Sequence, residues 1–204
     1  VIIGGGPAAT NAIETIREFD GGQSTITLLC DEPAHSRMAL PYWLAGTIPE
    51  AHTHTGDADY FARLQVATRF GVRVTAVDPR GRTVTLADGG KLDFDNLLIA
   101  TGSSPLTPTI PGADLPGVEP LWSLAHTERV LQYAGSLQPA GRTPRVVLVG
   151  AGFIGFIVLN AMHKRSWSLA VVEREVQVLP RMLDAPAADH VRRWLATRAV
   201  SVHC

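Results

Sequence analysis

The sequence predicts an α/β fold made of two Rossmann-like nucleotide-binding domains. A short apolar run leads through glycines into a helix-like stretch and a second apolar run at the start of the chain, and the same pattern returns from Arg145. The composition is that of a folded protein, because 46% of the 204 residues are hydrophobic and 18% are charged. A repeated strand–turn–helix–strand unit is typical of dinucleotide-binding architectures.

The first unit begins with Val1–Ile3, an apolar run typical of a strand buried on both faces of a parallel sheet. Gly4–Pro7 ends this run, and the proline suits a first helical turn. A second strand is predicted at Ile26–Cys30. Between the strands, apolar residues recur at the spacing of a helix: Ala8, Ala9, Ala12, Ile13, Ile16 and Phe19.

The second unit repeats this order near the other end of the chain. Arg145–Val149 predicts a strand, Gly150–Gly152 a turn, Phe153–Arg165 a helix and Ser168–Val172 the next strand. Ala199–Cys204 predicts a last strand with no later element to pack against. We therefore expect the chain to be a fragment that is incomplete at its C-terminus.

The region between the two units has a different pattern. Strand-like runs are predicted around Val72, Val74 and Val77, in a hairpin of Arg82–Leu86 with Lys91–Phe94, and at Leu97–Ala100. A proline-rich stretch from Ser103 to Pro120 is the candidate linker, and Ser123–Leu137 can form one helix. We place the domain boundary after residue 112, which gives domains 1–112 and 113–204.

Composition and charge exclude several classes of protein. The formal net charge is −1, from 18 basic and 19 acidic residues, and no basic tract is present, so nucleic acid is not expected as a partner. No run approaches the about 18 apolar residues of a membrane span. The two cysteines, Cys30 and Cys204, cannot build a disulfide framework, and their scarcity fits a reducing compartment such as the cytoplasm.

The first glycine turn has the spacing Gly4-x-Gly6-x-x-Ala9 between a strand and a helix. In a dinucleotide site, the first glycine makes the turn, the second leaves room for the pyrophosphate, and the small third residue lets helix and strand pack closely. Asp31 or Glu32 follows the next strand, where a ribose hydroxyl would bind. The alternative is an ordinary tight turn that binds no ligand.

The second glycine turn is Gly150-x-Gly152-x-x-Gly155, and Glu173 ends the strand that follows. A carboxylate there accepts hydrogen bonds from both ribose hydroxyls of NADH and repels the 2′-phosphate of NADPH. Arg174 leaves NADPH open as a second candidate, because its guanidinium can pair with a phosphate. A merely solvated Glu173 at a strand end is the structural alternative.

Several segments in this order carry a family resemblance, namely Val1–Ala9, Asn96–Gly102, Ile110–Gly112 and Arg145–Gly155. Together they resemble the FAD- and NAD(P)-dependent pyridine nucleotide-disulfide oxidoreductase superfamily over nearly the whole chain. Val178–Asp184 is similar to a segment that many members carry after the acidic residue of their second domain. The segment Ser36–Gly46 resembles its counterparts in ferredoxin- and rubredoxin-reductase-like members and in the flavoprotein portion of NADH-dependent nitrite reductases.

The resemblance implies that the first domain holds FAD and that the second holds NAD(H), with NADP(H) less favoured. The residues that it implies for FAD are Gly4, Gly6, Pro7, Ala8, Ala9, Asp31, Glu32, Arg37, Val74, Ala100, Thr101 and Gly102. Those that it implies for the nicotinamide nucleotide are Gly150, Gly152, Phe153, Ile154, Gly155, Glu173 and Arg174.

Two departures from the family pattern bear on mechanism. Disulfide reductases of the superfamily carry cysteine on a helix under the flavin, but the corresponding stretch here, Ser36–Gly46, contains none, and Cys30 is expected to be a small buried hydrophobe. Relatives usually carry a glutamate at the position of Ile157, close to where nicotinamide meets flavin. The alternative explanation for Ile157 is that it packs on the apolar helix face with Val158 and Ala161.

The sequence thus predicts an NAD(P)H-dependent flavin oxidoreductase without a redox-active disulfide, whose electrons pass to an acceptor protein or a small molecule. A quinone or oxygen as acceptor, or a non-catalytic flavin-binding sensor, are the alternatives. The resemblance also allows a homodimer formed through a domain absent from this chain. No side chain is identified as an acid–base catalyst, and His52 and His54 are interpreted as a solvated loop without metal, because their spacing does not converge.

Overall fold

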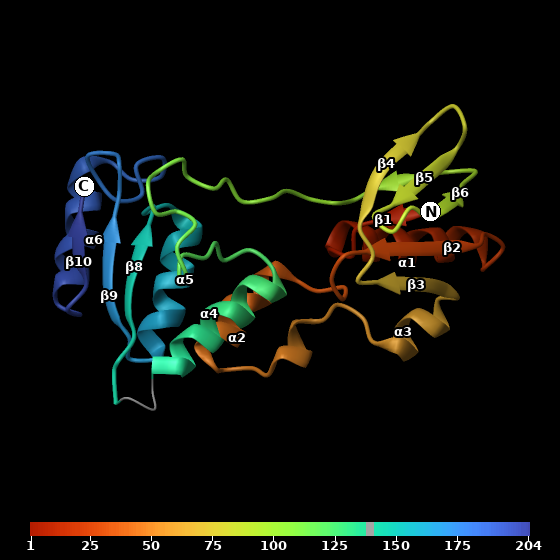
Figure 1. The fold of residues 1–204 in the computed structure, drawn as a ribbon. Helices are drawn as coiled ribbons and strands as arrows, with labels where there is room; N and C mark the ends of the chain where they lie inside the picture. The colour runs from red at the N-terminus through yellow and green to blue at the C-terminus, as the bar shows by residue number, and fades with distance from the viewer. Residues whose placement is uncertain (138–140) are drawn as a thin grey trace. The chain divides into compact units, whose positions relative to one another are not determined.

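The computed structural model describes residues 1–137 and 141–204, which form two compact units (Figure 1). Unit 1 comprises Val1–Ala39 and Glu50–Leu106, and unit 2 comprises Leu40–Pro49 and Thr107–Cys204. The main division is therefore at Leu106, whereas the sequence interpretation placed it after residue 112. The segment 40–49 belongs to unit 2 although unit 1 flanks it in the sequence.

The main sheet of unit 1 is parallel, with strand order β3-β2-β1-β7. Its strands are β1 (Ile2–Ile3), β2 (Ile26–Cys30), β3 (Val66–Phe70) and β7 (Leu98–Ile99). Parallel neighbours need a crossover connection, and helix α1 (Pro7–Asp20) supplies it between β1 and β2. The helix begins at a proline and ends at Gly21, which adopts the left-handed conformation that stops helices.

A small antiparallel sheet covers one face of this parallel sheet. It consists of β4 (Val74–Asp78), β5 (Thr83–Leu86) and β6 (Lys91–Asp93), which confirms the predicted hairpin. Val84 and Leu86 are buried in one cluster with Ile3 and Leu29. On the other face, Ile2 and Leu28 pack with residues of α1, so the first strands are buried on both faces, as the sequence predicts.

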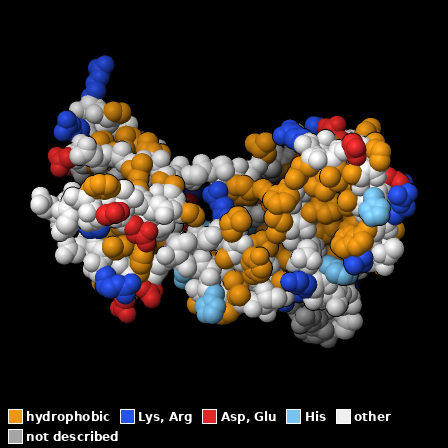
Figure 2. Space-filling model, turned by 180° about the vertical axis from the view of Figure 1, so that it is seen from behind, with side chains coloured by type: hydrophobic (Ala, Val, Ile, Leu, Met, Phe, Trp, Pro, Cys, Tyr) orange, Lys and Arg blue, Asp and Glu red, His pale blue; other side chains and the backbone are white. Residues whose placement is uncertain are grey.

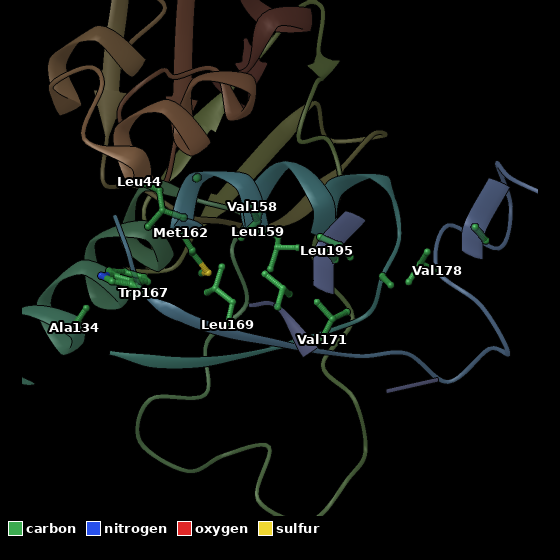
Figure 3. Close-up of a cluster of buried hydrophobic side chains, with 14 residues drawn as sticks. Leu44, Ala134, Val158, Leu159, Met162, Trp167, Leu169, Val171, Val178 and Leu195 are labelled. Atoms are coloured by element: carbon green, nitrogen blue, oxygen red, sulfur yellow. The ribbon is translucent and has the colours of Figure 1, made fainter. Parts of the chain in front are cut away.

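Unit 2 contains a parallel sheet of order β10-β9-β8, formed by β8 (Arg145–Val149), β9 (Ser168–Val172) and β10 (Ser201–His203). Helices α5 (Phe153–Lys164) and α6 (Ala185–Ala196) connect successive strands. Their buried side chains meet Leu169 and Val171 in a shared core (Figure 3). Figure 2 shows that hydrophobic side chains also gather on the surface of this unit.

The remaining helices are short, apart from α4 (Leu124–Leu137). They are α2 (Leu40–Ala45), α3 (Ala58–Arg63) and the 3₁₀ turns Arg37–Ala39 and Glu50–Thr53. Leu44 of α2 is fully buried in the core of unit 2 (Figure 3), and Arg165 at the end of α5 donates a hydrogen bond to the carbonyl of Leu44. These contacts explain why the segment 40–49 belongs to unit 2.

Some elements differ from the sequence interpretation. Strand β3 and helices α3 and α6 were not predicted, and Phe19 is 85% exposed although it follows the apolar spacing of α1. Over the described residues, no helix has the length and apolar character needed to cross a membrane.

The core of unit 1 gives a direct test of the packing. Leu28→Ala removes a fully buried side chain next to α1, and we expect it to lower the free energy of unfolding by about 2–5 kcal/mol. Leu106→Ala makes the same chemical change at a side chain that is 96% exposed, so it should cost less than about 0.5 kcal/mol. Urea denaturation of both variants measures the difference, and equal losses would contradict the described packing.

Candidate nucleotide-binding sites

The first glycine turn joins β1 to α1 through a backbone that other residue types cannot adopt. Gly4 has a φ of +102°, and a Cβ atom there would lie 2.3 Å from the carbonyl oxygen of Ala100. This crowding arises because β7 pairs with β1, where the amide of Ala100 donates to Ile3 at 2.8 Å. Gly4 is therefore required by the fold itself.

Gly6 is different, because neither its backbone angles nor its surroundings require a glycine at this position. Its φ of −78° suits any residue, and no atom of the described residues lies within 4 Å of the position that a Cβ would take. It is the N-cap of α1, a position that favours Ser, Thr, Asp and Asn and also accepts Gly. The open space beside the helix start is the cradle that a pyrophosphate needs.

The second glycine turn, between β8 and α5, repeats this division. Gly150 has a φ of +100°, and a Cβ on Gly155 would lie 2.5 Å from the carbonyl oxygen of Gly150, so both glycines serve the turn. Gly152, the N-cap of α5, has a φ of −80° and open space around its Cβ position in the part of the chain that the structure describes. Each turn therefore has one glycine whose backbone is unstrained and whose Cβ position is open.

The ends of α1 and α5 also differ from those of other helices in the molecule. Asp57 caps α3 and Asp184 caps α6 through hydrogen bonds of 2.7 and 3.0 Å to backbone amides. Among the described residues, no side chain caps Gly6 or Gly152, and the first turns of α1 and α5 carry no acidic residue. The positive end of α1 thus has no acidic residue in its own first turn, and at α5 the nearest anion is the carboxylate of Glu173, which accepts from the amide of Ala151 just before the N-cap.

Glu173 lies at the carboxyl end of β9 and faces the second glycine turn. Its carboxylate accepts hydrogen bonds from the amides of Ala151 at 2.7 Å and of Glu175 at 3.0 Å. The hydrogen bond from the Glu175 amide is the main cause that lowers the pKa of Glu173, and the bond from Ala151 adds to it. The carboxylate is therefore ionised and fixed beside the turn, where the sequence interpretation placed a ribose-binding group.

The contact between Glu173 and Ala151 was not anticipated from the sequence. A second bond reinforces it, since the amide of Leu179 donates to the carbonyl of Ala151 at 2.9 Å. The segment after β9 thus bonds both the amide and the carbonyl of Ala151 in the glycine turn. The spacing of residues along the sequence does not predict that Glu173 and Leu179 bond to Ala151.

The structure brings two distant FAD candidates of unit 1 together. The guanidinium of Arg37 lies 3.2 Å from the Cβ position of Gly102 and donates to the carbonyl of Ser103 at 3.0 Å. Ala100, two residues before Gly102, contacts Gly4. Arg37 and the segment 100–103 therefore lie next to the first glycine turn. Val74 is half-buried and packs on the cluster that contains Ile3.

The two acidic candidates after β2 have different surroundings. Asp31 pairs with Arg73 at 3.0 Å, and both side chains are well exposed. Glu32 is less exposed and lies 3.8 Å from Nε2 of His35. Both carboxylates follow the strand that pairs with β1, so the geometry leaves either of them available to a ligand at the first turn.

The other candidate residues differ in their exposure. Ala9 is fully buried, as its role in helix–strand packing requires. Pro7, Ala8 and Thr101 are exposed. In unit 2, Phe153 and Ile154 are more than half exposed at the start of α5, and Arg174 is 90% exposed beside Glu173.

Two expectations are corrected by the structure. Cys30 is half-buried rather than buried, and its Sγ lies 3.1 Å from the Cβ position of Gly5 in the first turn. Burial nevertheless raises the pKa of the Cys30 thiol, which keeps it protonated and a weak nucleophile. Ile157 is 36% exposed, so it does not share the buried face of α5 with Val158 and Ala161.

His52 lies on the 3₁₀ turn Glu50–Thr53, and His54 follows it. His54 lies 4.0 Å from Glu50, its neighbour on the preceding 3₁₀ turn. Within residues 1–137 and 141–204, no group of three or more histidine, cysteine or acidic side chains is arranged to hold a metal ion.

Comparison with known proteins identifies the family. The profile of the family described as pyridine nucleotide-disulphide oxidoreductase matches residues 1–204. The chain belongs to this family. It is 34% identical, over 98% of its length, to the ferredoxin–NAD(+) reductase component of the biphenyl dioxygenase system of Paraburkholderia xenovorans, and spans 48% of that protein.

Two further relatives extend the comparison. The chain is 30% identical to an NADH oxidase of Methanocaldococcus jannaschii, with 99% of the chain and 46% of the relative covered. The structure of an NAD-dependent persulfide reductase from A. fulgidus is 30% identical with a TM-score of 0.86, over 99% of this chain and 39% of that one. The chain thus spans about half the length, or less, of these members of the family.

The fixed carboxylate of Glu173 predicts a pH-dependent stability. Because its pKa is lowered in the folded state, its contribution is present at neutral pH, above the unfolded value of about 4.3, and is lost as the pH falls through the folded value. Glu173→Gln should lower Tm by about 2–4 °C at pH 7 and by less at pH 3. Thermal melts should show no such loss of Tm for Glu128→Gln on α4. A loss of Tm for Glu173→Gln that is larger at pH 3 than at pH 7 would contradict the proposed pH dependence.

Proposed function

We propose that unit 1 binds FAD and unit 2 binds NADH, as the nucleotide-binding part of an NADH-dependent flavin oxidoreductase. The single observation that carries this proposal is the open space at Gly6 and Gly152. Neither glycine is explained by its φ angle or by a neighbouring atom of the described residues, yet each stands at the start of a helix that follows a parallel strand. A close approach by a pyrophosphate accounts for both.

The residues around the first turn fit FAD. Gly6 and the start of α1 would hold the pyrophosphate, Asp31 or Glu32 the adenosine ribose, and Arg37 with the segment 100–102 would lie beside the turn. The residues proposed for FAD are those inferred from the sequence: Gly4, Gly6, Pro7, Ala8, Ala9, Asp31, Glu32, Arg37, Val74, Ala100, Thr101 and Gly102.

The residues around the second turn fit NADH. Gly152 and the amides at the start of α5 would hold its pyrophosphate, and the ionised carboxylate of Glu173 would accept the ribose hydroxyls. The full proposed set is Gly150, Gly152, Phe153, Ile154, Gly155, Glu173 and Arg174. When both are bound, the two cofactors supply hydride transfer from nicotinamide to flavin, and the chain supplies binding and orientation.

We further propose that the electron acceptor is a small redox protein of the ferredoxin or rubredoxin type. The relative from Paraburkholderia xenovorans is named as a ferredoxin–NAD(+) reductase component, which supports this choice. An internal dithiol is not part of the proposal, because Ser36–Gly46 holds no cysteine and the thiol of Cys30 has a raised pKa. Two free cysteines support a cytoplasmic location.

Molecular oxygen is the second candidate acceptor, since the relative from Methanocaldococcus jannaschii is named as an NADH oxidase. We expect NADH oxidation by the FAD-loaded protein to be at least about tenfold faster with an added ferredoxin than in air-saturated buffer alone, because a redox protein docks at a defined distance from the flavin. Absorbance of NADH measures both rates, and equal rates with stoichiometric oxygen uptake would favour the oxidase.

Substitution at the open glycines tests the two nucleotide sites separately. Gly6→Val should release FAD while the affinity for NAD⁺ stays unchanged, and Gly152→Val should weaken NAD⁺ binding by at least about tenfold while FAD is retained. Flavin absorbance of the purified protein and calorimetric titration with NAD⁺ measure these effects.

The control for these variants is the glycine that the fold itself requires. Gly4→Val should lower Tm sharply, because its Cβ would collide with the carbonyl of Ala100, whereas the fold should tolerate a side chain at Gly6 and Gly152. If Gly6→Val and Gly152→Val retain both ligands with native affinity, the turns do not bind nucleotides.

Ile157→Glu tests whether the position on the second turn of α5 orients the nicotinamide. Because Ile157 is 36% exposed, a glutamate there remains solvated and should leave Tm unchanged. We expect the rate at which NADH reduces the bound flavin to rise by about tenfold, since a better-placed nicotinamide shortens the approach. Anaerobic stopped-flow absorbance, with Ile157→Gln for comparison, measures this; an unchanged rate at native Tm would assign no orienting role to the site.

A further inference from the structure

Three consecutive side chains at the end of β9 are joined in one charged arrangement. Nη2 of Arg174 lies 2.9 Å from a carboxylate oxygen of Glu175, and the backbone amide of Glu175 donates to the carboxylate of Glu173 at 3.0 Å. Arg174 is 90% exposed and the side chain of Glu175 is 50% exposed. Glu175 therefore contacts Glu173 through its backbone amide and Arg174 through its side chain.

The charges of this arrangement would affect whether the site accepts a phosphate at the 2′ position of the adenosine ribose. Glu173 is fixed beside the glycine turn by Ala151, so its neighbours Arg174 and Glu175 are held at the same edge of the site. A guanidinium next to the ribose is the group that usually accommodates a 2′-phosphate. Here the carboxylate of Glu175 pairs with that guanidinium and adds a second negative charge.

We propose that Glu175 is a specificity-determining residue that withholds Arg174 from a 2′-phosphate and so directs the site toward NADH. This rests on the proposed binding of NADH at the second glycine turn. Glu173 alone would repel a 2′-phosphate, but the adjacent Arg174 would offset that repulsion. Because Glu175 pairs with Arg174, the guanidinium no longer offsets the repulsion of the phosphate by Glu173. The two acidic residues therefore act together.

The test measures the adenosine end of the site without turnover. ADP-ribose and 2′-phospho-ADP-ribose are titrated calorimetrically into the intact FAD-loaded protein at low salt. We expect the wild type to prefer ADP-ribose, and Glu175→Gln to bind 2′-phospho-ADP-ribose about fivefold more tightly, as loss of an exposed ion pair allows. Its affinity for ADP-ribose should stay close to that of the wild type, and its gain should shrink at high salt.

Three variants separate this role from a general change of charge. Glu175→Asp keeps the carboxylate and should keep the wild-type preference. Glu128→Gln removes one negative charge from exposed α4 and should leave the ratio of the two affinities unchanged. Adding Arg174→Gln to Glu175→Gln should abolish the gain, because the freed guanidinium is what binds the phosphate.

The outcomes distinguish the inference from the proposed function. If Glu175→Gln leaves the ratio of the two affinities unchanged while the wild type binds ADP-ribose, the role of Glu175 is overturned and NADH binding stands. If the same gain persists without Arg174, the role of the ion pair is overturned. If the wild type binds neither probe, both the nucleotide site and the inference fail.

Discussion

The constraint on which both units depend is the close passage of backbone against backbone where a parallel strand turns into a helix. At the first turn, the space that a Cβ of Gly4 would need is occupied by the carbonyl of Ala100, the residue that follows β7. At the second turn, the carbonyl of Gly150 occupies the corresponding space beside Gly155. Side chains are excluded at these points, so helix and sheet approach closely enough to share one core.

The same passage creates the candidate binding sites. Once Gly4 and Gly150 have turned the chain, Gly6 and Gly152 stand at the N-termini of α1 and α5 with open space beside them. The N-terminus of a helix, with its free backbone amides, is suited to phosphate. In unit 2 the carboxylate of Glu173 is fastened to this turn, which places an acceptor of ribose hydroxyl groups beside the proposed phosphate position.

Much of this arrangement follows from the sequence, because local periodicity and glycine spacing specify β1, α1, β8, α5 and their turns. Other features depend on tertiary contacts. The residues of β3 form a strand because they pair with β2, although Val66 is the sole buried residue of Val66–Phe70. Leu44 reaches the core of unit 2 only through packing against distant helices. The exposure of Ile157 likewise depends on which face of α5 meets the sheet, and apolar spacing did not reveal it.

The central claim is that the two turns are separate sites for two nucleotides. Amide hydrogen exchange of the intact protein, followed by mass spectrometry of its peptides, tests this most directly. FAD added to the flavin-free protein should slow exchange in residues 1–13, and NAD⁺ should slow exchange in residues 146–160, each leaving the other peptide unchanged. Protection of both peptides by one ligand alone, or of neither turn by either ligand, would contradict the account.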